Sequence, residues 1–157
     1  MKLFLFFAGC ICFTAGSAQQ ADTVKYSVVT AGKITGVQLN YKKGAADYYY
    51  HYEYNDRGRG PSINTHIKTN EKGMIVLQEI SGVDYYKNAV QEKFEVKNGK
   101  ASWKNKFENE TAAFTGQLYS SINGTPGEAG LTYKILRAQP THKIPVLPSG
   151  NISFKKV

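Results

Sequence analysis

The chain has 157 residues and a formal net charge of +8, from 20 Lys and Arg against 12 Asp and Glu. This length allows one domain with a real hydrophobic core, but not two. The basic residues are scattered one or two at a time, without a run of four or a basic helix. That pattern is typical of a solvated surface, so we expect no nucleic-acid partner.

Residues 1–18 have the pattern of a secretory signal peptide. Lys2 gives a positive start, residues 3–13 are almost entirely apolar, and Gly16, Ser17 and Ala18 supply small residues for cleavage. The apolar run is shorter than the ~20 residues that a membrane-spanning helix needs, and no second run follows. We therefore expect an exported protein without a membrane span, periplasmic or extracellular, whose single domain covers residues 19–157.

Both cysteines, Cys10 and Cys12, lie within this leader, so the mature chain contains no cysteine. Residues 7–10 resemble the lipobox of bacterial lipoproteins. However, few residues precede Cys10, and Phe7 stands where leucine is usual. Cleavage after Ala18 is thus favoured over a lipid anchor at Cys10.

Residues 47–55 alternate in the period of a β-strand. Tyr48, Tyr50, Tyr52 and Tyr54 share one face, which we expect to be packed, and the opposite face is mixed. Further candidate strands, separated by turn residues, are 24–31, 34–41, 62–69, 74–80, 89–96, 101–103, 117–122, 144–147 and 152–157. The prediction is a mainly β fold: an antiparallel meander or a partly closed barrel.

One short helix is predicted near the C-terminus. Thr125 is a candidate N-cap, Pro126 suits the first helical position and Glu128 the third. Leu131 and Ile135 follow at helical spacing, and the helix should end before residue 140.

No catalytic or metal-binding motif is present. The three histidines, His51, His66 and His142, lack the spacing of a zinc site, and no nucleophile elbow occurs. We predict no catalytic residue, no metal site and no cofactor within this chain.

Two loops supply the candidate ligand-binding residues. Residues 55–61 could bind an anion through Arg57 and Arg59, although a simple turn is the favoured interpretation. Residues 82–88 could present Tyr85 and Tyr86 to a ligand, or those rings could plug the end of a barrel. Tyr54 completes the candidate set.

Four segments, taken in order, form a recognisable series: YEYNDRGRGP (52–61), SGVDYYKN (81–88), ASWKNK (101–106) and LPSG (147–150). With the leader, the tyrosine-rich β region and the short helix, this series resembles the N-terminal region of secreted bacterial amidohydrolase-family proteins. The resemblance covers essentially all of the mature chain.

The resemblance implies a metal-dependent (β/α)8 barrel downstream, whose His-x-His pair and other metal ligands this sequence lacks. Hydrolase activity is therefore implied by the resemblance only. Our first hypothesis is a non-catalytic accessory region whose partner is an amidohydrolase catalytic domain in the same or another chain. The alternative is a stand-alone exported ligand-binding β domain.

Overall fold

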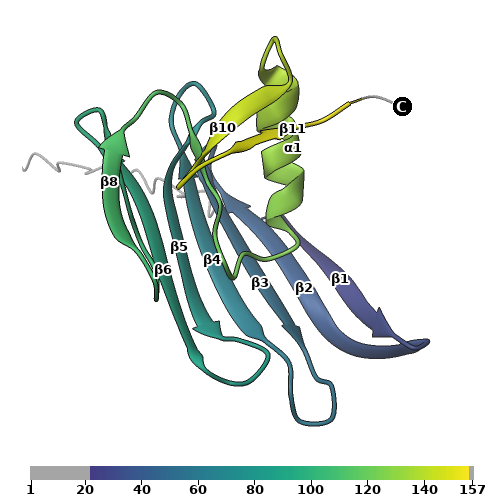
Figure 1. Cartoon of the computed structure of the whole chain (residues 1–157). Helices are drawn as coiled ribbons and strands as arrows, with labels where there is room; N and C mark the ends of the chain where they lie inside the picture. Colours follow the sequence, from purple (N-terminus) through teal and green to yellow (C-terminus); the bar gives the residue numbers. More distant parts are fainter. Residues whose placement is uncertain (1–21, 156–157) are drawn as a thin grey trace, which may run out of the picture.

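The structure is a computed structural model that describes residues 22–155. The predicted signal peptide (1–18) and Cys10 lie outside these residues. Eight strands form one antiparallel sheet in sequence order (Figure 1). They are β1 (Asp22–Thr30), β2 (Lys33–Lys43), β3 (Asp47–Tyr54), β4 (Ser62–Thr69), β5 (Ile75–Val83), β6 (Ala89–Lys97), β7 (Lys100–Lys104) and β8 (Asn109–Ala113).

A two-residue turn shows how the sequence fixes this register. Asn98 and Gly99 join β6 to β7, and both have positive φ, 51° and 72°. This is the sign that a type I′ turn requires, and Asn-Gly adopts it readily. Because side chains alternate along a strand, the register places every second residue of the sheet on the same side as Tyr48, Tyr50, Tyr52 and Tyr54 of β3. We call this side the inner face.

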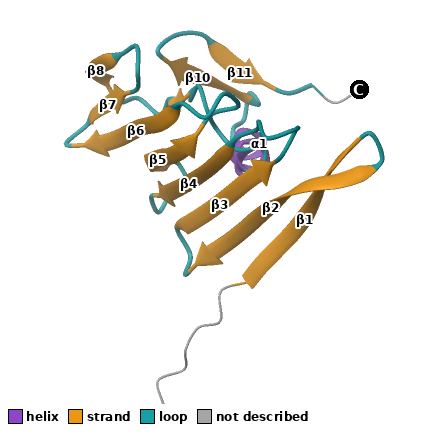
Figure 2. Ribbon diagram, turned by 90° about the horizontal axis from the view of Figure 1, so that it is seen from below, coloured by secondary structure: helices purple, strands orange, loops and turns teal. Residues whose placement is uncertain are grey.

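The helix α1 (Glu128–Ala138) lies across the inner face (Figures 1 and 2). Its buried residues Leu131, Ile135 and Leu136 pack into one cluster with Phe94, which has no exposed surface, and with Trp103. Burial of such side chains contributes about 1.5–3 kcal/mol each. The main core therefore lies between α1 and the sheet.

A second sheet holds the C-terminal part of the chain against this core. β10 (Lys143–Leu147) pairs in parallel with β9 (Leu118–Tyr119) and antiparallel with β11 (Asn151–Ser153). Ile144 and Leu147 are buried, and Phe154 packs against the main core. These apolar side chains near the end of the described chain therefore pack into or against the main core.

The predicted mainly β meander with one helix near the C-terminus is confirmed, and the sheet does not close into a barrel. The helix begins later than predicted: Thr125 to Gly127 form a turn, and Gly127 is the N-cap. β8 was not predicted, because its sequence NETAA has no apolar alternation. Within residues 22–155, no helix is long and apolar enough to cross a membrane.

Candidate functional site

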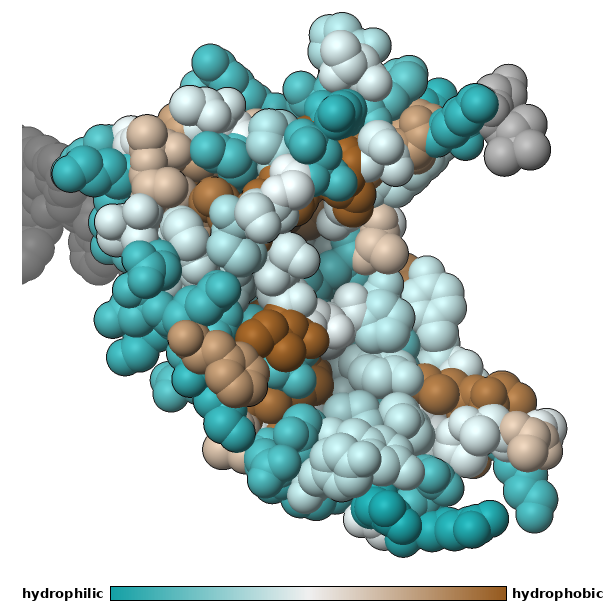
Figure 3. All heavy atoms as spheres, in the orientation of Figure 1, coloured by the Kyte–Doolittle hydropathy of each residue, from teal (hydrophilic) through white to brown (hydrophobic). Residues whose placement is uncertain are grey.

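The inner face is covered over only part of its area. The segment between β9 and α1 crosses β5 and β6, where Glu92 accepts hydrogen bonds from the backbone N–H groups of Ile122 (3.0 Å) and Asn123 (2.8 Å). Figure 3 shows a hollow at the right, between the part of the molecule that holds α1 and the lower part of the sheet. The inner face of β1 to β3 is open there.

This hollow contains a cavity of about 500 Å³ between the first three strands and the start of α1. Tyr26, Gln38 and Tyr52 form its sheet side, and Gly127 and Gly130 its helix side. A side chain at Gly127 would collide with Gln38, since an added Cβ would lie 2.6 Å from its Nε2. The glycine therefore permits the close approach of helix and sheet that shapes the cavity.

Gln38 is a buried polar side chain at the edge of this cavity, 6% exposed. Its Nε2 donates to Asn40 Oδ1 at 2.6 Å, while its Oε1 has no hydrogen-bond partner within residues 22–155. Buried amides normally satisfy both ends, so this acceptor is an unsatisfied polar group beside the open face.

From Tyr52, a continuous series of aromatic rings leads away from the cavity to the end of the sheet. Tyr52 and Tyr54 lie 5.8 Å apart between ring centroids, Tyr54 and Tyr85 6.4 Å, and Tyr85 and Tyr86 5.2 Å. Such offset and edge-on arrangements are the favourable ones for aromatic pairs. Tyr86, at the end of the series, is 71% exposed.

The loop between β3 and β4 is a tight hairpin. The backbone N–H of Asp56 donates to the carbonyl of Arg59 at 2.7 Å, and the Arg59 N–H returns a bond at 3.0 Å. Arg57 and Gly58, at the tip, have φ of 54° and 86°. Positive φ at both central residues matches a type I′ turn. The predicted turn is thus present, and it projects its arginines outward.

The loop between β5 and β6 is fixed by the carboxylate of Asp84. Asp84 Oδ1 accepts from the backbone N–H groups of Tyr86 (2.8 Å) and Asn88 (2.9 Å), and Oδ2 accepts from the Asn88 side chain at 2.9 Å. The Asn88 side-chain hydrogen bond, followed by the two backbone bonds, lowers the pKa of Asp84. The loop is therefore held rigidly although it is exposed.

Three contacts tie the two loops together. The Tyr85 hydroxyl donates to Asp56 Oδ2 at 2.8 Å, the Gly60 N–H donates to the Tyr85 carbonyl at 3.1 Å, and Lys87 Nζ donates to the Gly60 carbonyl at 2.7 Å. The hydrogen bond to Asp56 raises the pKa of Tyr85, and the charge of Arg59 acts on it in the opposite direction. Arg59 therefore belongs to the same local cluster as Tyr85.

We call the five predicted residues, Tyr54, Arg57, Arg59, Tyr85 and Tyr86, the tyrosine–arginine end. The structure brings Tyr54, Arg59, Tyr85 and Tyr86 together, with both arginines exposed. Arg57 stands apart at the hairpin tip, without a side-chain hydrogen bond, ion pair or ring contact among the described residues. The two rings of the β5–β6 loop plug no barrel, because the sheet is open.

Sequence reasoning did not assign Tyr26 and Gln38 to this site. The two residues are opposite each other in the β1–β2 pair. Gly32, in the turn between β1 and β2, gives the signal for this hairpin, but the sequence alone does not show which face the later helix leaves open.

No group of three or more His, Cys, Asp and Glu side chains is placed to hold a metal ion in the part of the chain that the structure describes. Comparisons of the chain with protein-family models, with curated proteins and with solved structures found no match.

Proposed function

We propose that this chain is a non-catalytic recognition module of an exported amidohydrolase-like protein. In this proposal its tyrosine–arginine end binds a small acidic or aromatic ligand, and the catalytic domain lies in the same or another chain. One observation supports the binding role. Two hydrogen-bonded loops meet and expose Tyr86 and Arg59 at the end of the series of aromatic rings that begins at Tyr52.

The chemistry of this end suits a flat anion. Tyrosine rings offer large apolar faces with little conformational entropy to lose, and a guanidinium can bind a carboxylate through two parallel hydrogen bonds. Neither arginine is in an ion pair with a described carboxylate, and Asp56 and Asp84 accept hydrogen bonds within the loops. The loops are also fixed before a ligand arrives, which lowers the entropic cost of binding.

The association with an amidohydrolase rests on the four resembling segments. Two of them, 52–61 and 81–88, form the joined loops described above. In the third, Trp103 Nε1 donates to Glu108 at 3.0 Å, and Asn105 donates to the Tyr119 hydroxyl at 3.0 Å. The segments thus include both loops of the tyrosine–arginine end and, through Asn105 and Tyr119, one contact between the large sheet and the small one.

A titration with N-benzoylglycine tests the binding role, because this probe combines an aromatic ring, an amide and a carboxylate. We expect saturable binding that the R57Q/R59Q double variant weakens about tenfold, as expected for a lost charge-assisted contact. R59Q should cause more of the loss than R57Q, since Arg57 stands apart. R137Q, an exposed arginine on α1, is the matched control. Equal affinity of the double variant and the wild type would refute the assigned site.

The same mixtures test the non-catalytic role. Purified chain, with or without added Zn²⁺, should leave N-benzoylglycine intact, whereas robust metal-dependent hydrolysis would overturn the proposal. For the accessory role, an immunoblot of the native cell envelope should show a band several times larger than 17.4 kDa, or a co-purifying amidohydrolase. A lone band at or slightly below that mass would favour the stand-alone binding domain.

A further inference from the structure

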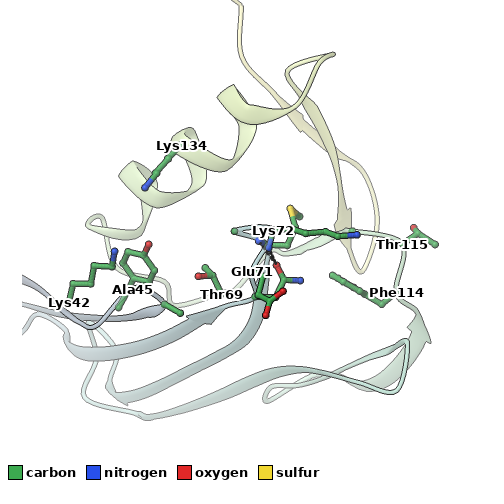
Figure 4. A pocket seen from close by; sticks show the side chains of 14 residues that line it. Lys42, Ala45, Thr69, Glu71, Lys72, Phe114, Thr115 and Lys134 are labelled. Atoms are coloured by element: carbon green, nitrogen blue, oxygen red, sulfur yellow. Dashed lines mark hydrogen bonds between the residues drawn. The ribbon is translucent and has the colours of Figure 1, made fainter.

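A second hollow lies at the opposite end of the sheet from the tyrosine–arginine end. It has a volume of about 1080 Å³ and is lined by the β2–β3 turn, the β4–β5 turn, the loop after β8 and one residue of α1. Figure 4 shows these segments around it. We call it the lysine groove, after Lys42, Lys72 and Lys134. Its size is that of a small-molecule site.

The inner surface of the groove is largely apolar. Ala45, Tyr48, Met74 and Phe114 line it, and the last three are partly buried against the main core. These side chains are therefore held in place by packing on one side while their other side faces the groove. An apolar surface of this kind favours a ligand with an apolar body.

The charge around the groove is predominantly positive. Lys134 extends from α1 toward Lys42, whereas Glu71 lies on the β4–β5 turn beyond Thr69 (Figure 4). Lys42 Nζ lies 5.1 Å from the centre of the Tyr48 ring. None of the three lysines is in an ion pair with a described carboxylate. The paired lysines, Lys68, Lys93 and Lys97, belong to β4 and β6.

We propose that the lysine groove binds an amphipathic organic anion, with its carboxylate between Lys42 and Lys134 and its apolar body along Tyr48 toward Met74 and Phe114. The ammonium groups of Lys42 and Lys134, which have no ion-pair partner among the described residues, lie at one end of the apolar surface of the lysine groove. One ligand can therefore contact both the charges and the apolar surface. This site is separate from the tyrosine–arginine end and does not depend on its function.

Calorimetric titrations with decanoate, decanol and acetate test the proposal on the purified mature chain. Decanoate should bind with one site per chain, and both decanol, which lacks the charge, and acetate, which lacks the apolar body, should bind at least about tenfold more weakly. Decanol binding as tightly as decanoate would overturn the role of the lysines, and acetate binding equally well would overturn the role of the groove.

Variants locate the binding. K42Q/K134Q should weaken decanoate about tenfold, while K25Q, an exposed lysine on β1, should leave it unchanged. Wild-type affinity in K42Q/K134Q, or an equal loss in K25Q, would contradict the site. Circular dichroism of each variant shows whether it remains folded. The R57Q/R59Q variant should keep its decanoate affinity; if that affinity falls as well, the anion binds at the other end and the proposal fails.

Discussion

Two halves of one strand behave differently in this protein. Tyr50 and Tyr54 lie on the same face of β3. Tyr50 is only 7% exposed under α1, whereas Tyr54 belongs to the series of rings that runs from Tyr52 to Tyr86. Burial raises the pKa of Tyr50 to about 12. One regular aromatic strand thus supplies both core residues and exposed rings, depending on which part of it a later segment of the chain covers.

The boundary between the two halves is set by Glu128 in the first turn of α1. Its Oε1 accepts from the Thr125 hydroxyl (2.9 Å) and the Thr65 hydroxyl (2.8 Å), and its Oε2 accepts from Gln78 Nε2 at 2.7 Å. These bonds fix the start of the helix onto β4 and β5. The covered core lies on one side of this anchor and the cavity of the open face on the other.

The largest effect is expected in the part of the inner face that α1 covers. Phe94→Ala should lower the free energy of unfolding by about 3–5 kcal/mol, because it removes a fully buried ring and leaves a cavity. Tyr86→Ala, in the exposed half, should change it by less than about 0.5 kcal/mol. Urea unfolding followed by circular dichroism measures both. Similar losses for the two variants would show that the halves do not differ as described.

A smaller effect is expected at the boundary, as a dependence on pH. Burial raises the pKa of Glu128 above its usual value. The protonated form is therefore favoured by folding, so its contribution is complete below the unfolded pKa and is lost as pH rises through the folded pKa. The stability of wild type relative to Glu128→Gln should therefore fall as the pH rises from 4.5, the ordinary pKa of a glutamate, towards neutral pH. A constant or rising difference over that range would contradict the assigned burial.

The smallest effect is expected at the edge of the open half. Ile34 is 73% exposed beside the β1–β2 turn, so Ile34→Ala should cost less than about 0.5 kcal/mol. Ile80→Ala is the matched comparison in the same sheet. Ile80 is 1% exposed, so this change should lower the free energy of unfolding by about 2–5 kcal/mol. A cost above 1 kcal/mol at Ile34 would mean that this surface is covered in solution.

Much of the sheet can be predicted from the sequence, because alternation and turns are local signals. The sequence predicts the strand Ser62–Thr69 with its observed bounds, and the register confirms that Tyr48, Tyr50, Tyr52 and Tyr54 share one face of β3. The sequence does not predict β8, because an edge strand whose side chains are mostly exposed needs no apolar pattern.

The candidate site could be predicted only in part. Both loops were identified, but their joining through Tyr85 and Asp56 depends on the meander that places β3 and β4 beside β5 and β6. The cavity beside Gln38 depends on where Gly127 meets the sheet, a contact between residues far apart in the chain. Such long-range packing leaves no local pattern in the sequence.

We propose that the tyrosine–arginine end, at the open part of the inner face, binds a small acidic or aromatic ligand. Nuclear magnetic resonance of the chain with isotope-labelled tyrosine rings, titrated with N-benzoylglycine, tests it most directly. We expect saturable shifts for Tyr54, Tyr85 and Tyr86, and none for the buried rings Tyr50 and Tyr119. Shifts confined to the buried rings, or no saturable shift at the tyrosine–arginine end, would contradict it.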